Sequence, residues 1–308
     1  MNSNTVIMIV TTIIQIPSFF CAIQSVRFSK NNNPLRQLQN HVLGCLLLVS
    51  IWTIGIDLPF TQAYLWLNTV PIRTTWACIF YNVSFFSMTG LNRMLMAFMC
   101  IERHFLVFHN HLYRTHRSRL LLHYIPLCLT ILSVLIYFII INAFISCGDI
   151  SFDYTRFMCG YTCGIRVRNL GMVHIWLNVF APTAITIIAS ILLPIRFVIQ
   201  KHSLHRLQWY RARKMIIQTS IIAGAYIMCW LSYSIILQLL VNGILSFFDP
   251  NVALFFIYGP YITSLLTPFI VQHTIPGWMN RKMMNQIKLL FFPEQRLAKP
   301  RTGVFTPQ

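Results

Sequence analysis

The sequence predicts an all-α membrane protein, a bundle of seven transmembrane helices with its N-terminus outside. Three observations predict it. Of the 308 residues, 56% are hydrophobic and only 10% are charged, the apolar residues form long runs, and the basic residues stand in short blocks between those runs. An average soluble domain has about 25% charged residues, so this chain cannot build a polar shell. The composition excludes a cytosolic enzyme, a disordered protein and a secreted disulfide scaffold.

The formal net charge of +18 would also suit a nucleic-acid-binding protein. The basic residues, however, alternate with apolar runs, which is the pattern of membrane topology and not of a protein that enters a nucleic-acid groove. We therefore expect membrane lipids as partners and no nucleic acid.

A helix that crosses a bilayer needs about 20 apolar residues. The sequence has seven such runs, at residues 5–28, 40–66, 76–108, 121–146, 170–199, 214–245 and 252–273. The third run contains polar residues, but its apolar density supports one tilted helix. Five prolines are expected to kink these spans without ending them, because neighbouring helices can satisfy the freed carbonyl groups. They are Pro17, Pro59, Pro126, Pro182 and Pro268.

The basic residues orient the bundle. Of the 24 Lys and Arg residues, 19 lie at the ends of the first, third, fifth and seventh runs or in the segments that lead from them to the start of the next run. The opposite side has only Arg73, Arg156, Arg166 and Arg168. Because cytoplasmic loops carry the excess of Lys and Arg, the N-terminus is expected outside and the C-terminus inside. The first run is expected to be a signal-anchor and not a cleaved signal peptide, since its basic residues follow the apolar stretch.

Three parts of the chain are therefore expected. Residues 1–275 form the seven-span bundle, 276–292 form an amphipathic helix along the inner membrane face, and 293–308 form a cytoplasmic tail. In the second part, basic residues such as Arg281 and Lys288 alternate with apolar ones, which is typical of a helix that lies in the membrane interface.

Four of the nine cysteines, Cys78, Cys147, Cys159 and Cys163, fall on the predicted outer side, where disulfides persist. Four cysteines allow three pairings, and the sequence does not choose among them. A zinc site is the competing interpretation, which the oxidising compartment disfavours. We therefore expect no metal site.

Four charged residues lie inside the predicted spans, where each is a candidate for function because a charge at membrane depth is costly. They are Asp57, Arg93, Glu102 and Arg103. Asp57 and Arg93 could form a direct ion pair, or could be hydrated in a polar cavity. Glu102 and Arg103 are adjacent at the inner end of the third span, where a pair that reaches into the lipid headgroups is the alternative to a functional one.

Four short sequence features stand at defined positions along these spans. Cys78 opens the third span 25 residues before Arg103, which stands within Glu102-Arg103-His104; Cys229-Trp230 lies in the sixth span and Pro268 in the seventh. In this arrangement the chain resembles the rhodopsin-like (class A) family of G-protein-coupled receptors over nearly its whole length. The resemblance implies a disulfide from Cys78, which we assign to Cys159. A second disulfide could join Cys147 and Cys163.

The chain also departs from the family pattern. Ser232 stands where the sixth-span motif has proline, Thr267 and Val271 stand where the seventh-span motif has asparagine and tyrosine, and Ser50 replaces the sodium-site aspartate. Phe85 stands where amine receptors have an aspartate, and Tyr261 where opsins have the retinal lysine. An amine receptor and a visual pigment are therefore not expected.

The resemblance implies an activation switch and a ligand pocket. In the resting state Glu102 holds Arg103, and Arg103 is released to the G protein when the sixth helix moves; Trp230 and Pro268 take part in this switch. The pocket implied is aromatic, although aromatic residues at helical spacing are also ordinary packing. Its expected residues are Phe85, Phe86, Trp230, Tyr233, Tyr258 and Tyr261.

The expected function is that of a plasma-membrane receptor that binds an extracellular ligand and activates heterotrimeric G proteins. No enzymatic activity and no cofactor are expected, because the motifs of hydrolases and nucleotide-binding enzymes are absent. Two alternatives stay open: a seven-span transporter, which would show internal repeats and charges along a path, and a receptor-like protein that does not signal. An intramembrane enzyme is the weakest alternative, since His174 and His273 stand alone near span ends.

Overall fold

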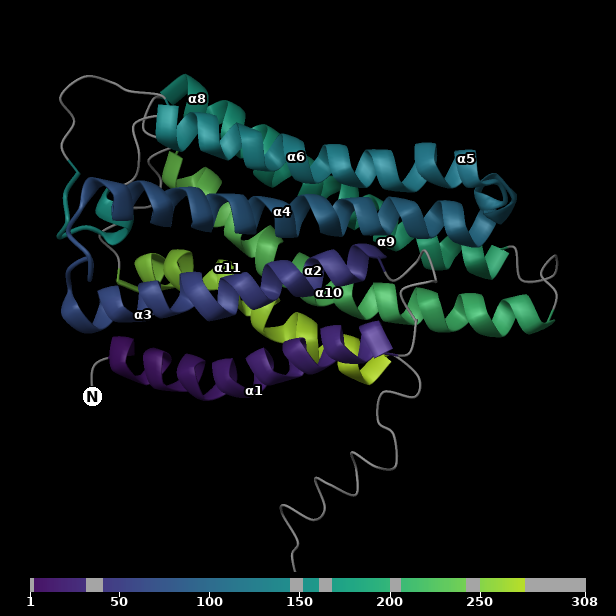
Figure 1. The fold of residues 1–308 in the computed structure, drawn as a ribbon, viewed down its shortest axis with the longest axis horizontal. Helices are drawn as coiled ribbons and strands as arrows, with labels where there is room; N and C mark the ends of the chain where they lie inside the picture. Colours follow the sequence, from purple (N-terminus) through teal and green to yellow (C-terminus); the bar gives the residue numbers. More distant parts are fainter. Residues whose placement is uncertain are drawn as a thin grey trace, which may run out of the picture.

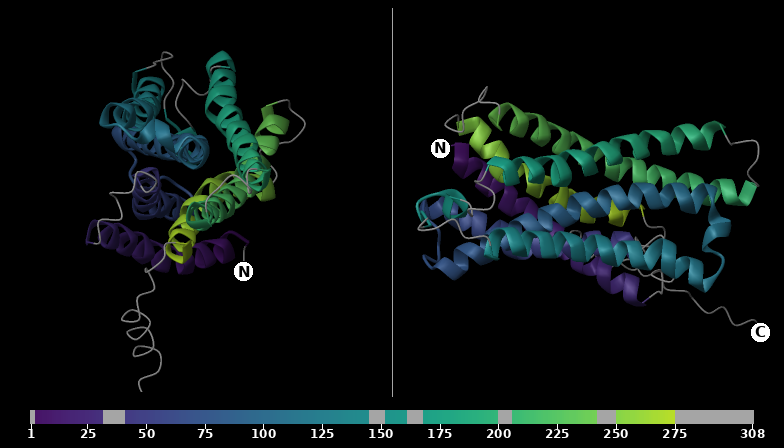
Figure 2. Two further views of the ribbon diagram at one scale, coloured as in Figure 1. Left: turned by 90° about the vertical axis from the view of Figure 1, so that its right-hand side faces the viewer. Right: turned by 90° about the horizontal axis from the view of Figure 1, so that it is seen from above.

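The computed structural model describes residues 3–31, 41–144, 152–160, 168–199, 206–241 and 250–274. Within these ranges every regular element is a helix. The long helices lie side by side along one axis (Figure 1), and a view along that axis shows them as a bundle (Figure 2). The expectation of an all-α fold is confirmed for this part of the chain.

The elements follow the predicted runs. In chain order they are α1 (Ser3–Asn31), α2 (His41–Trp52), η3 (Thr53–Asp57), α3 (Leu58–Leu67), α4 (Thr75–Phe108), η4 (Asn110–Tyr113), α5 (His116–Arg119), η5 (Leu120–Tyr124), α6 (Ile125–Ile139), η6 (Ile140–Phe144), η7 (Phe157–Gly160), α8 (Arg168–His174), η8 (Ile175–Phe180), α9 (Ala181–Ile199), α10 (Arg206–Val241) and α11 (Pro250–Thr274).

Six helical stretches of the described residues are long and apolar enough to cross a membrane. They are Met8–Arg27, His41–Leu67, Thr75–Phe108, His116–Phe144, Leu170–Ile199 and Ile216–Leu239. The chain is therefore a helical membrane protein, with six such helices in its described part. The seventh predicted run coincides with α11, but a seventh crossing and the orientation in the membrane stay predictions. The predicted helix at 276–292 and the tail at 293–308 lie outside the described residues.

Three of the five prolines expected to distort spans follow a π-helical turn. Pro59, Pro126 and Pro182 come just after η3, η5 and η8. Proline has no N–H to close the normal α-helical turn, and the preceding backbone bonds reach five residues back, as from Ala181 N–H to the Trp176 carbonyl. Pro17 and Pro268 lie inside the continuous helices α1 and α11.

Helix α4 is the centre of the bundle. In the most apolar stretch of α4, 78% of the residues are buried, whereas in that of the first span 17% are buried. The reason is that α4 packs against α2, α6, α9 and α10. Gly90 permits one of these contacts, since a Cβ there would lie 2.5 Å from Cε2 of Phe138 on α6. The outer helices instead expose large apolar side chains, among them Ile13, Leu129, Val198 and Met228. Such an apolar surface suits a membrane-embedded protein.

Candidate functional site: the buried polar groups along α4

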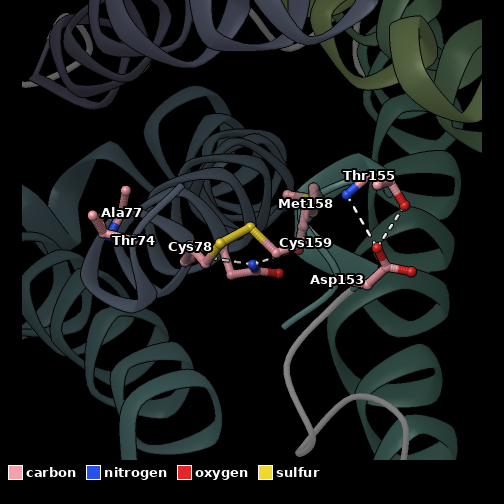
Figure 3. Close-up of a disulfide and its surroundings, with 8 residues drawn as sticks. Thr74, Ala77, Cys78, Asp153, Thr155, Met158 and Cys159 are labelled. Carbon is pink, nitrogen blue, oxygen red and sulfur yellow. Dashed lines mark hydrogen bonds between the residues drawn. A yellow bond between two sulfur atoms is a disulfide. The ribbon is translucent and has the colours of Figure 1, made fainter. Parts of the chain in front are cut away.

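The first end of α4, here called the Cys78 end, is tied to the loop segment 152–160 by a disulfide. Cys78 and Cys159 form it, with 5.9 Å between their Cα atoms (Figure 3). Asn82, one turn along α4, donates from Nδ2 to the carbonyls of Cys78 and Met158, both at 2.9 Å. The assigned Cys78–Cys159 pair is confirmed. Cys147 and Cys163 lie outside the described residues.

The loop segment itself is folded tightly. Met158 and Cys159 are buried and adopt positive φ angles of 54° and 56°, a conformation that non-glycine residues rarely adopt. The Asp153 carboxylate accepts hydrogen bonds from the hydroxyl and the backbone N–H of Thr155 (Figure 3). These bonds, with help from Arg156, lower the pKa of Asp153. The disulfide thus joins α4 to a tightly folded loop segment at this end of the bundle.

Asp57 is almost fully buried, and its partner is a hydroxyl group. Ser84 on α4 donates to Oδ1 of Asp57 at 2.5 Å, and Trp52 donates from Nε1 to the Ser84 hydroxyl at 2.7 Å. The alternative of a direct ion pair between Asp57 and Arg93 is therefore wrong. Asp57 lies level with Ser84, and Arg93 is nine residues further along α4, which is about 13 Å of helix rise.

Arg93 is 3% exposed and contacts η8 and α10. Its Nε donates to the carbonyl oxygen of Asn178 at 2.6 Å, and its guanidinium carbon lies 4.4 Å from the centre of the Trp230 ring. Asn178 stands four residues before Pro182, so its carbonyl oxygen does not receive the N–H donor that residue 182 would supply in a regular helix. The proline therefore frees the acceptor that Arg93 uses.

The other end of α4, the Glu102 end, holds a chain of titratable side chains. The Glu102 carboxylate is bonded to Nδ1 of His123 on η5, and Nε2 of His123 lies 3.1 Å from Nδ1 of His41 on α2. Both Glu102 and His123 are buried. On the adjoining turn, burial and the charge of Glu102 raise the pKa of Tyr113 to about 12.

Arg103 is 1% exposed. The alternative of a pair that reaches into the headgroups does not fit, since both side chains are inside the bundle. Next to them, an apolar cluster closes α9 and α10 against α4. Its residues are Leu193, Phe197 and Ile216, with Val107 and Phe108 packed on them.

The six residues of the predicted aromatic pocket lie together in the core of the bundle. Phe85 contacts Tyr261 and Trp230 contacts Tyr233, with ring centres 5.8 Å and 5.2 Å apart. A small cavity of the bundle is lined by none of the six. Its polar residues are Asn92, Tyr226, Thr263 and Thr267. That the six aromatic residues bind a ligand therefore stays a prediction, as do the roles of Trp230 and Pro268 in a switch.

Sequence reasoning missed four partners: Ser84, His123, Asn178 and His174. His174 is 7% exposed, and its ring contacts Phe86 and Phe138. Only Asn178 had a signal in the sequence, namely its place four residues before a proline. In the described ranges, no group of three or more His, Cys, Asp or Glu side chains could hold a metal ion.

No protein-family model matches this chain, and no curated protein matches it. The functional interpretation therefore depends on the geometry of these buried groups and on the motif resemblance.

Proposed function

We propose that this protein is a seven-span receptor of the plasma membrane that binds an extracellular ligand and activates heterotrimeric G proteins from its Glu102 end. The observation that carries the proposal is the burial of Glu102 and Arg103 together at one end of the most buried helix. Removing a charge from water and burying it in a protein has a free-energy penalty of several kcal/mol. In membranes, buried charges mark functional positions. This pair lies at the end of α4 opposite the disulfide.

The environment of Arg103 supports a resting, closed arrangement. The apolar contacts between Phe108, Phe197 and Ile216 cover the helix ends beside Arg103. Movement of α10 away from α4 would open these contacts and expose the guanidinium. A ligand favours that state only as far as it binds it more tightly than the closed one.

The structure adds a partner to the proposed switch. Glu102 is bonded to His123, so its carboxylate is held by η5. A charge-assisted bond in a buried site is strong and directional. In this proposal, the Glu102–His123 bond keeps the closed state together, and neutralising Glu102 favours the open state.

The test is nucleotide exchange on a panel of G proteins, in membranes that contain the wild type, Glu102→Gln or Arg103→Ala at equal surface expression. We expect higher basal exchange with Glu102→Gln and none with Arg103→Ala. Arg114→Ala removes an exposed arginine near the same end and is the matched control; it should behave as the wild type.

Equal exchange in the wild type and both variants would contradict the switch. Absence of exchange in all of them, with every G protein tested, would contradict the receptor proposal and favour the non-signalling protein or the transporter. Uptake of labelled solutes into proteoliposomes would then separate these two alternatives.

A further inference from the structure

Arg93 is a buried cation that has no anionic partner among the described residues. Three acidic residues lie in the described ranges, and none forms an ion pair with it: Asp57 accepts from Ser84, Glu102 is bonded to His123, and Asp153 pairs with Arg156. The neutral contacts of Arg93 are the Asn178 carbonyl and the Trp230 ring. An uncompensated charge inside a membrane protein is costly, so an anion bound at Arg93 would be stabilising.

The side chains near Arg93 also have more donors than acceptors. The guanidinium carries five N–H groups, and within the described part of the chain its one hydrogen bond is made by Nε. Trp230 Nε1, Tyr226 Oη and His174 Nδ1 are buried and have no hydrogen-bond partner among the described residues. Tyr226 packs against the Trp230 ring on which Arg93 lies, with ring centres 5.9 Å apart, and His174 packs against Phe86 on α4. A group of donors around a cation is complementary to an anion.

The surroundings restrict the kind of anion. The two terminal nitrogens of a guanidinium match the two oxygens of a carboxylate. No second Lys or Arg of the described residues joins the cluster, so a doubly charged phosphate would leave an uncompensated negative charge. Around the polar atoms lie aromatic rings: Phe86 and Phe138 contact His174, and Tyr226 contacts Trp230. These rings suit an apolar ligand body.

We propose that Arg93, with Tyr226, Trp230 and His174 around it, binds the carboxylate of a monoanionic ligand whose body is aromatic or otherwise apolar. The proposal names a ligand class for the receptor proposed above. Ligand binding does not depend on that receptor function; only the signalling that binding would cause does. In the free protein, the Trp230 ring and the Asn178 carbonyl hold the guanidinium in place; the bound carboxylate would engage its terminal N–H groups.

The test uses phenylbutyrate and its uncharged analogue phenylbutanol as probes, with the full chain purified in lipid nanodiscs. The thermal unfolding midpoint is followed as each probe is titrated, because a ligand that binds the folded state raises it. We expect phenylbutyrate to stabilise the wild type at lower concentration than phenylbutanol. Arg93→Gln should weaken phenylbutyrate binding about tenfold or more, since hydrogen bonds to charged groups are the strong ones.

Two further variants keep the test decisive. Tyr226→Phe removes only an unpartnered hydroxyl, so the fold should be retained while phenylbutyrate binds about fivefold more weakly. Arg73→Gln removes an exposed arginine at the Cys78 end and should change nothing. Equal effects of the acid and the alcohol, or acid binding that survives in both Arg93→Gln and Tyr226→Phe, would overturn the site.

Because no G protein is present, this result is separate from the exchange experiment. Acid-specific binding by a protein that never promotes exchange would support the carboxylate site and contradict only the receptor function.

Discussion

The two ends of α4 are held in place by different kinds of interaction. At the Cys78 end, a covalent bond to Cys159 and the two bonds from Asn82 attach the helix to segment 152–160. At the Glu102 end, α4 is held by the contact between Glu102 and His123, by a hydrogen bond of His104 to the Ala189 carbonyl at 2.8 Å, and by apolar packing.

This difference indicates which end can change. A disulfide does not open without chemistry, whereas ion pairs, hydrogen bonds and apolar contacts can open when a competing state is stabilised. The Glu102 end is therefore the end at which a change in helix packing is least costly, in agreement with the proposed function. Three predictions test the comparison.

The largest effect is expected at the covalent end. Replacing both cysteines, Cys78→Ser with Cys159→Ser, should lower the free energy of unfolding by up to about 4.5 kcal/mol, the chain-entropy value for a loop of this length. The sequence separation is 81 residues. Chemical denaturation in detergent micelles would measure it. Basal nucleotide exchange should not rise, since the Glu102 end is intact; a rise would contradict the division of roles between the ends.

The next effect is expected at His123. His123→Leu leaves the Glu102 carboxylate buried without its partner and should lower the free energy of unfolding by about 3 kcal/mol. Unlike the cysteine replacement, it should also raise basal exchange. Adding Glu102→Gln removes the uncompensated charge and should restore part of the stability. The same denaturation assay measures this change. Wild-type stability and wild-type exchange in His123→Leu would show that the Glu102–His123 bond does not stabilise the closed state.

The smallest effect is expected between the two ends. Gly90→Ala would place a Cβ 2.5 Å from the Phe138 ring, and such overpacking costs about 1–3 kcal/mol. Gly224→Ala is the matched control, because nothing lies within 4 Å of the added Cβ and alanine favours helix by up to about 1 kcal/mol. Thermal unfolding of the pair should shift in opposite directions; equal shifts would mean that α4 and α6 can separate at Gly90 without cost.

Much of the fold could be predicted from the sequence. Six of the seven predicted runs agree with helices that begin and end within five residues of them, as with 76–108 against Thr75–Phe108, because apolar length is a local property of the sequence. The exception is α10, which begins at Arg206, eight residues before the sixth run. The Cys78–Cys159 disulfide could also be predicted, because the position of Cys78 relative to Arg103 is part of the resemblance to the receptor family. The same argument located Asp57, Arg93, Glu102 and Arg103 at membrane depth, because a charge inside an apolar run is visible in the sequence.

The partners of those charges were decided only by the tertiary structure. Ser84 for Asp57, the Asn178 carbonyl for Arg93 and His123 for Glu102 each come from another helix. Which residue faces which depends on the rotation and axial shift of neighbouring helices, and on π turns such as η8 that change the direction of a carbonyl. Apolar periodicity in a helix exposed to lipid carries little of this information, because both the core and the lipid side are apolar. The sequence thus determined that this protein is a helical membrane protein with buried charges, and the packing of the helices determined what each charge contacts.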